Sequence, residues 1–127
     1  MSHLADTHAL LWFAQEPERL SRRAKDILER TDEAVFFSMA SVWEIAIKLG
    51  LGKLRLERTL TEFVEAQLVN GFQLLPIRLA DAVQQIELPW HHRDPFDRML
   101  ISQAITQDLK IVSADPLFAR YRVKRIW

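Results

Sequence analysis

The chain has 127 residues, 49% of them apolar and 27% charged, and this length and composition suit a single domain over residues 1–127 with one core. Its 17 basic and 17 acidic side chains cancel, which excludes a global field that would attract nucleic acid or anionic lipid. The absence of cysteine excludes disulfides, thiolate catalysis and cysteine-bound zinc. Because the sequence lacks both a run of about 20 apolar residues and a signal-like N-terminus, we expect a soluble cytoplasmic protein with no membrane association.

Short apolar segments alternate with segments that have helical spacing or capping residues. In chain order, the first half is predicted to contain a weak strand at 2–5, a helix from about 8 that Pro17 interrupts, a helix at 21–30, a strand at 35–37 and a helix at 39–49. The second half is predicted to contain a helix at 59–70, a strand at 72–77, a helix at 80–87, a helix from 95, a strand at 110–113, a helical turn at 115–116 and a strand at 123–126.

Strands that alternate with helices pair in parallel through right-handed crossovers. We therefore predict an α/β fold, a three-layer α/β/α sandwich with a central parallel sheet. In such sheets the ligand site lies beyond the carboxyl ends of the strands, where the strand order reverses. Asp6 directly follows the first predicted strand, and Asp115 follows the strand at 110–113. If those two strands are neighbours, both carboxylates face one crevice.

The segment from His91 to Ala104 places two carboxylates, Asp94 and Asp97, on either side of Pro95 at the start of a helix. Proline and acidic residues both suit a first helical turn, so capping alone is one interpretation. Asp97 lies within that turn, where the helix aims its side chain rigidly. Asp94 precedes the proline and is held in an extended conformation, which favours a role as the helix cap or as an outer carboxylate.

Three further carboxylates, Asp6, Glu44 and Asp115, each have an ordinary alternative interpretation. Asp6 is a suitable N-cap for the helix that follows it, and Asp115 precedes a proline and suits a turn or helix start. Glu44 shares a polar helical stripe with Lys48, so its alternative is a solvated helix face with a Glu44–Lys48 ion pair.

Together these carboxylates predict a site for a divalent metal. Four or five carboxylates that converge on one pocket stay ionised only when a cation neutralises them. A ligand set dominated by oxygen matches Mg²⁺ or Mn²⁺. The histidines are not expected to bind zinc, because His91 and His92 are adjacent and point different ways, and His3 and His8 have no partners at ligand spacing.

A carboxylate metal site suits phosphodiester hydrolysis, because the metal activates a water and stabilises charge on the attacking and departing oxygens. Thr7 and Ser113 lie next to or near the predicted ligands Asp6 and Asp115, and are candidates to orient a water or a ligand. Seven basic residues either hold a phosphate backbone or are ordinary surface residues. They are Lys48, Arg93, Arg98, Arg120, Arg122, Lys124 and Arg125.

Four segments in order along the whole chain carry a family resemblance. They are Asp6–Trp12, Ser41–Lys48 with Gly52–Leu54, His92–Arg98, and Asp115–Phe118. In combination they resemble a PIN-domain ribonuclease toxin of the VapC type, from a type II toxin–antitoxin system. The resemblance implies a PIN fold, Mg²⁺- or Mn²⁺-dependent endoribonuclease activity on RNA, a small antitoxin that blocks the site, and a homodimer. It also implies an acidic quartet, formed here by Asp6, Glu44, Asp97 and Asp115. Asp94 would be one further carboxylate that is typical of this subgroup.

The sequence departs from the usual pattern of this family in two places. The first strand is normally a fuller aliphatic run than Ser2–Ala5, so a short strand is expected here. Ser113-Ala114-Asp115 stands where Thr-Arg-Asp is more usual, which removes the arginine that would contact a phosphate.

Two other functions stay open at this point. An aspartyl-phosphate phosphatase would use Asp6 as its nucleophile. Such an enzyme requires a second Asp two residues later as its acid/base, and the residue at that position is His8. A non-catalytic PIN-fold module would bind a protein partner or RNA and use its carboxylates as caps and surface. The intact quartet argues against such a module. The candidate surface for an antitoxin consists of Trp12, Trp43, Phe63, Leu68 and Val69, and the alternative is that all five belong to the core.

Overall fold

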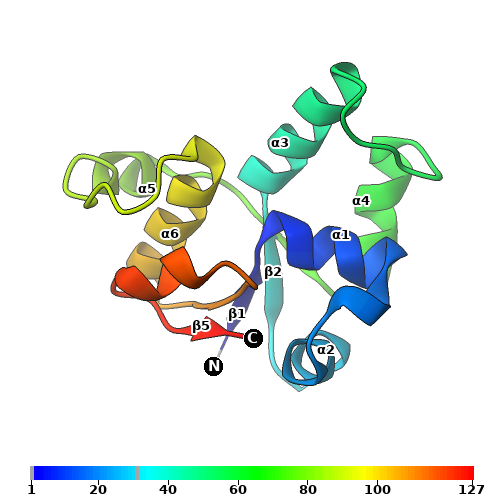
Figure 1. Cartoon of the computed structure of the whole chain (residues 1–127), viewed down its shortest axis with the longest axis horizontal. Coiled ribbons are helices and arrows are strands. Elements are labelled where there is room, and N and C mark those ends of the chain that lie inside the picture. The colour runs from blue at the N-terminus through cyan, green and yellow to red at the C-terminus, as the bar shows by residue number, and fades with distance from the viewer. Residues whose placement is uncertain (1, 31) are drawn as a thin grey trace.

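The computed structural model describes residues 2–30 and 32–127, and a five-stranded parallel sheet runs through its centre (Figure 1). The strands are β1 (His3–Ala5), β2 (Val35–Ser38), β3 (Gln73–Leu75), β4 (Lys110–Val112) and β5 (Arg125–Ile126). They lie in the order β3-β2-β1-β4-β5, and each neighbouring pair is parallel. The chain moves outward from β1 to β3 on one side and then to β4 and β5 on the other. The strand order therefore reverses between β1 and β4, where a ligand site is expected.

Helices cover both faces of this sheet. They are α1 (Thr7–Gln15), α2 (Arg22–Glu29), α3 (Met39–Gly50), α4 (Leu60–Val69), α5 (Leu79–Gln84) and α6 (Pro95–Gln107), with the 3₁₀ helices η1 (Pro17–Arg19) and η2 (Pro116–Arg120). Successive strand residues point to opposite faces, so Leu4 packs in the core under α6 and Ala5 packs in the core under α1, α2 and α4. Figure 1 shows these two groups of helices on opposite sides of the strands. The predicted three-layer sandwich is therefore confirmed.

The main differences from the predicted elements lie at their ends. The strand expected at 72–77 is limited to β3, because Pro76 has no N–H to continue the ladder. The strand expected at 123–126 forms only two paired residues at the edge of the sheet, and the helix expected at 80–87 is the shorter α5. Among the described residues, no helix combines the length and apolar character that crossing a membrane requires.

The candidate antitoxin surface is only partly exposed. Phe63 is buried at 3% exposure, so it belongs to the core between α4 and the sheet and not to a partner surface. Trp12 is half-buried and packs against Trp127. Leu68 and Val69 at the end of α4, and Trp43 on α3, are exposed, so the core alternative is wrong for these three.

Helix α6 is fixed next to the carboxyl ends of β2 and β3. Its apolar face is buried through residues such as Leu100 and Ile101. The Gln103 side chain donates to the Pro76 carbonyl at 3.2 Å and accepts from the Ser38 hydroxyl at 2.6 Å. Because Ser38 ends β2 and Pro76 follows β3, these bonds hold α6 against the carboxyl edge of the sheet, where the site is expected.

Candidate active site

Asp6 lies directly after β1, at the centre of the carboxyl edge of the sheet. Its Oδ1 accepts the Ala9 N–H at 2.8 Å, so the predicted role as N-cap of α1 is confirmed. The side chain is also buried, and the Ser113 hydroxyl bonds to it. Burial raises the pKa of Asp6 above its ordinary value, with a further contribution from the negative charge of Asp115. The cap thus also belongs to an acidic cluster.

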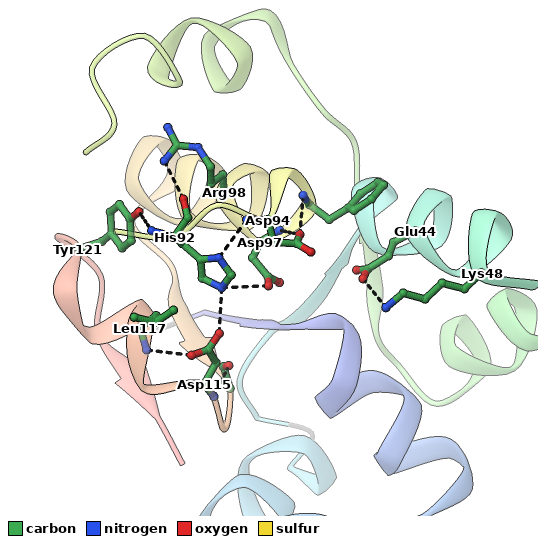
Figure 2. A network of polar contacts seen from close by, with 11 residues as sticks. Glu44, Lys48, His92, Asp94, Asp97, Arg98, Asp115, Leu117 and Tyr121 are labelled. Carbon is green, nitrogen blue, oxygen red and sulfur yellow. Dashed lines mark hydrogen bonds and ion pairs between the residues drawn. The ribbon is translucent and has the colours of Figure 1, made fainter. Parts of the chain in front are cut away.

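The two carboxylates at the start of α6 have the different positions that the intervening Pro95 predicted. Asp94 is the N-cap, and its Oδ1 accepts the N–H groups of Phe96 at 2.8 Å and Asp97 at 3.0 Å. Asp97 lies in the first helical turn, and its side chain points away from that cap (Figure 2). The structure therefore separates a carboxylate that holds the helix from one that the helix presents.

Asp97 is the point where the negative charges converge. Its pKa is raised to about 8, first by burial and then by the charges of Asp94, Asp6, Glu44 and Asp115. All four of these carboxylates raise the pKa of Asp97, although they are far apart in the sequence. Glu44 lies in α3, and the other three are the N-caps of α1, α6 and η2. The structure thus brings together the five carboxylates that the sequence singled out.

Glu44 projects from α3 into this cluster. Its Oε2 pairs with the Lys48 ammonium at 2.9 Å, so the predicted ion pair is present (Figure 2). The alternative of a solvated helix face is wrong, however, because Glu44 is only 5% exposed. Its Oε1 is buried and has no hydrogen-bond partner among the described residues. An unpaired buried carboxylate oxygen is costly, which points to a missing partner at this position.

Asp115 begins η2 and is held at both oxygens. Its Oδ1 accepts the Leu117 N–H at 2.9 Å, which confirms the predicted helix start. Its backbone N–H donates to the Ser113 hydroxyl at 3.0 Å. Ser113 therefore connects Asp115 to Asp6 across the switch point between β4 and β1. The Thr7 hydroxyl, by contrast, donates to Ser41 on α3 at 2.8 Å and ties α1 to α3.

His92 is a site residue that sequence reasoning missed. Its Nε2 lies 2.9 Å from Asp115 Oδ2 and 3.1 Å from Asp97 Oδ2. Both contacts are drawn as dashed lines in Figure 2. One atom from each of these three residues lies within 4.8 Å of the others. The two adjacent histidines do point different ways, since His91 is exposed and His92 is buried. The available signal was the position of His92, two residues before the Asp94 cap.

Arg98 is not available to hold a phosphate backbone, which corrects one sequence expectation. Its side chain is buried, and the guanidinium donates to three backbone carbonyls of the preceding loop, of Leu88, Pro89 and His92. The guanidinium carbon also lies 3.6 Å from the centre of the Trp90 ring. Arg98 therefore fixes the loop that carries His92. Of the other basic candidates, Lys48 pairs with Glu44, Arg125 donates to the Ser113 carbonyl, and the exposed ones are Arg93, Arg120, Arg122 and Lys124.

We expect Arg98→Lys to destabilise the fold by about 2 kcal/mol, because an ammonium cannot serve three carbonyls in the fork geometry of a guanidinium and leaves buried acceptors unpaired. Arg93→Lys, on the exposed neighbour in the same segment, is the matched control and should change stability by less than about 0.5 kcal/mol. Urea unfolding of both variants measures the difference. Equal stability of the two would show that Arg98 does not hold the loop.

The donor set fits a hard divalent cation. In Glu44 and Asp97 a protein donor contacts one carboxylate oxygen, Oε2 and Oδ2 respectively, which leaves the other oxygen for a ligand. The buried Oε1 of Glu44 has no hydrogen-bond partner among the described residues, and burial together with the neighbouring carboxylates raises the pKa of Asp97, so a cation would stabilise both groups in their charged form. Carboxylate oxygens are the ligands that Mg²⁺ and Mn²⁺ prefer.

Comparisons with known proteins agree with this geometry. The family model for the PIN domain matches residues 4–124. Ribonuclease VapC22 from Mycobacterium tuberculosis is 27% identical over 123 residues, which cover 96% of this chain and 93% of that protein. The crystal structure of VapBC2 from Rickettsia felis bound to a DNA fragment from its promoter has a similar chain, with a TM-score of 0.75 and 13% identity over 99% of this chain and 98% of that one.

A second solved structure extends the likeness in fold. FitAcB from Neisseria gonorrhoeae has a TM-score of 0.71 and 19% identity, and the match covers 100% of this chain and 97% of that chain. At such low identity these structures show a shared fold alone. The identity to the mycobacterial ribonuclease and the family match add the sequence evidence.

Proposed function

The chain belongs to the PIN domain family, and from this premise we propose that it is a metal-dependent endoribonuclease of the VapC type, the toxin of a toxin–antitoxin pair that cleaves RNA phosphodiester bonds. The proposal takes residues 1–127 as one nuclease domain that acts in the cytoplasm. It is carried by one observation, the convergence of Asp6, Glu44, Asp97 and Asp115 at the switch point of the sheet. The similarity to a named ribonuclease supports the same reaction.

In this proposal Asp6, Glu44, Asp97 and Asp115 hold Mg²⁺ or Mn²⁺, and Asp94 acts from outside as the cap that orients Asp97. When bound, such an ion lowers the pKa of a coordinated water and offsets negative charge on the phosphate. The chain contributes rigid placement of its own oxygens. The Ala9 N–H holds Asp6, the Lys48 ammonium holds Glu44, and the Asp94 cap fixes the turn that presents Asp97.

The hydroxyls and the lysine near the quartet have supporting roles in the proposal. Ser113 bonds to Asp6 and Asp115 together, so it keeps the ends of β1 and β4 in register. Thr7 acts further out, through Ser41 on α3. Lys48 is 38% exposed in its side chain while its ammonium contacts Glu44, so it presents positive charge at the rim where an RNA phosphate would arrive.

The purified protein is expected to cut total RNA into discrete fragments when Mg²⁺ or Mn²⁺ is present. EDTA should stop the reaction, because it removes the ion that the carboxylates require, and excess Mg²⁺ should restore it. Gel analysis with mapping of fragment ends measures the result. Cleavage that continues in EDTA would contradict the metal mechanism, and no cleavage with either ion would favour the non-catalytic module.

A cognate antitoxin is expected to bind this chain and block cleavage. Coexpression with the small protein encoded beside it should give a complex that purifies intact and does not cut RNA, whereas the isolated chain does. The chain alone should have twice its monomer mass by light scattering, as a homodimer would. A coexpressed neighbour that purifies separately and leaves cleavage unchanged would contradict the toxin–antitoxin assignment.

A further inference from the structure

His92 lies between two carboxylates of the acidic cluster, Asp97 and Asp115, although it comes from the irregular loop before α6. Its Nε2 faces two carboxylates at once, Asp115 Oδ2 at 2.9 Å and Asp97 Oδ2 at 3.1 Å. Those two carboxylates come from different parts of the chain, because Asp115 is the N-cap of η2 and Asp97 lies in α6. The imidazole ring is therefore the one direct side-chain link between Asp97 and Asp115 among the described residues.

The hydrogen bond at His92 Nδ1 determines which ring nitrogen of the neutral imidazole carries the proton. His92 Nδ1 lies 3.2 Å from the backbone nitrogen of Asp94, and that N–H is a donor. A backbone N–H can only donate, so Nδ1 must present its lone pair. In the neutral ring the proton then resides on Nε2, which donates it to the two carboxylates.

The protein also fixes the orientation of this ring. The ring packs against Phe118, with centroids 5.8 Å apart. The His92 backbone N–H donates to the Tyr121 hydroxyl at 2.7 Å, and its carbonyl accepts from the buried Arg98 guanidinium at 3.2 Å. Contacts on the ring face and on both backbone groups leave the imidazole little freedom to turn away.

This arrangement is that of a hydrogen-bond donor and not of a metal ligand. A ligating imidazole nitrogen must offer its lone pair to the ion. If His92 Nε2 did so, the neutral ring would have to carry its proton on Nδ1, directly against the Asp94 N–H. Two hydrogens would then oppose each other. The nearness of His92 to the carboxylates therefore does not make it part of the ligand set.

We propose that His92 is a positioning residue: its Nε2–H ties Asp97 to Asp115 and so sets the gap between two carboxylates that hold the divalent ion. The inference rests on the proposed function, because it concerns the metal site of that function. Donors that orient metal-binding groups in this way typically change metal affinity about 10- to 100-fold when they are removed.

The test measures Mn²⁺ affinity of the intact chain by titration calorimetry, without RNA. His92→Phe keeps a ring against Phe118 and removes the donor, so Mn²⁺ affinity should fall about 10- to 100-fold. His92→Gln places an amide N–H near the position of Nε2 and should retain most of the affinity. His92→Asn reaches only to the position of Nδ1 and should behave like His92→Phe.

The neighbouring His91→Phe is the matched control, because His91 is exposed and its ring packs on Tyr121 instead of on a carboxylate. Its Mn²⁺ affinity should equal that of the wild type. If His92→Phe fails to fold, the Mn²⁺ affinities of His92→Gln and His92→Asn still show whether a donor at the position of Nε2 is required. In RNA cleavage, His92→Phe should lower kcat at saturating RNA more than it raises KM.

Pulsed EPR of bound Mn²⁺ separates a donor from a ligand. The wild-type protein should show no coupling to a directly bound histidine nitrogen, and such a coupling would overturn the inference. Equal Mn²⁺ affinity of wild type and His92→Phe would overturn it too, while the proposed function would stand. Failure of the wild type itself to bind Mn²⁺ would overturn the metal-dependent function and the inference with it.

Discussion

Asp97→Asn is expected to lower RNA cleavage by at least about 100-fold while the fold stays intact. The substitution keeps the size of the side chain and removes the charge at the point where four other carboxylates act. A metal ion contributes several kcal/mol to stabilisation of the transition state, and each 1.4 kcal/mol corresponds to about tenfold in rate. Cleavage of a defined RNA at saturating Mg²⁺ measures the loss, and circular dichroism verifies the fold.

Asp108→Asn is the matched control for this experiment. Asp108 is the exposed residue at the other end of the same helix, and it has a left-handed backbone that asparagine also accepts. This variant should cleave RNA at the wild-type rate. If Asp97→Asn also cleaves at that rate, Asp97 does not hold the ion and the proposed centre is wrong.

Without a divalent ion, the protein should become less stable as the pH rises from about 5 to about 8. The pKa of Asp97 is raised to about 8 in the folded protein, whereas in the unfolded chain it has its ordinary value near 3.8. Between these values the folded state keeps a proton that the unfolded state gives up, so rising pH favours unfolding. Burial raises the pKa of Asp6 in the same direction. The expected loss is about 2–4 kcal/mol of unfolding free energy.

Asp97→Asn should remove most of this loss, and at pH 8 in EDTA the variant should melt at a higher temperature than the wild type. Burial lowers the pKa of His3, and this shift makes the folded state more stable as the pH rises toward 6.5. Because His3 is present in both proteins, the variant and the wild type are compared at the same pH. Mn²⁺ should restore the wild type alone, since it binds the folded state. A variant less stable than the wild type at pH 8 would mark Asp97 as a structural cap instead.

The layers of the fold and the carboxylates of the site could be predicted because each depends on local pattern. Alternating strands and helices determine a parallel sheet, and the proline between Asp94 and Asp97 separates cap from presented carboxylate. The short strand His3–Ala5 was a weak prediction from its own residues. It is stable because it lies at the centre of the sheet, paired on both sides.

The surroundings of the site depend on contacts between distant segments, which the sequence pattern does not contain. His92 meets Asp115 only because η2 folds back over the loop before α6. Arg98 follows Asp97 directly, and nothing in its spacing indicated that its partners would be the carbonyls of that same loop. For Glu44 the polar stripe on its helix was compatible with a solvated face as well as with a metal site, and only the fold shows that this stripe faces the other carboxylates.

The way Arg98 holds its loop has a consequence for how the family can diversify. The guanidinium binds carbonyl oxygens, and every amino acid supplies one. Residues such as His91, which faces solvent, are therefore free to change over evolutionary time without displacing the imidazole beside them. The amino acids at the exposed positions of this loop and the placement of its buried imidazole are therefore set by separate contacts.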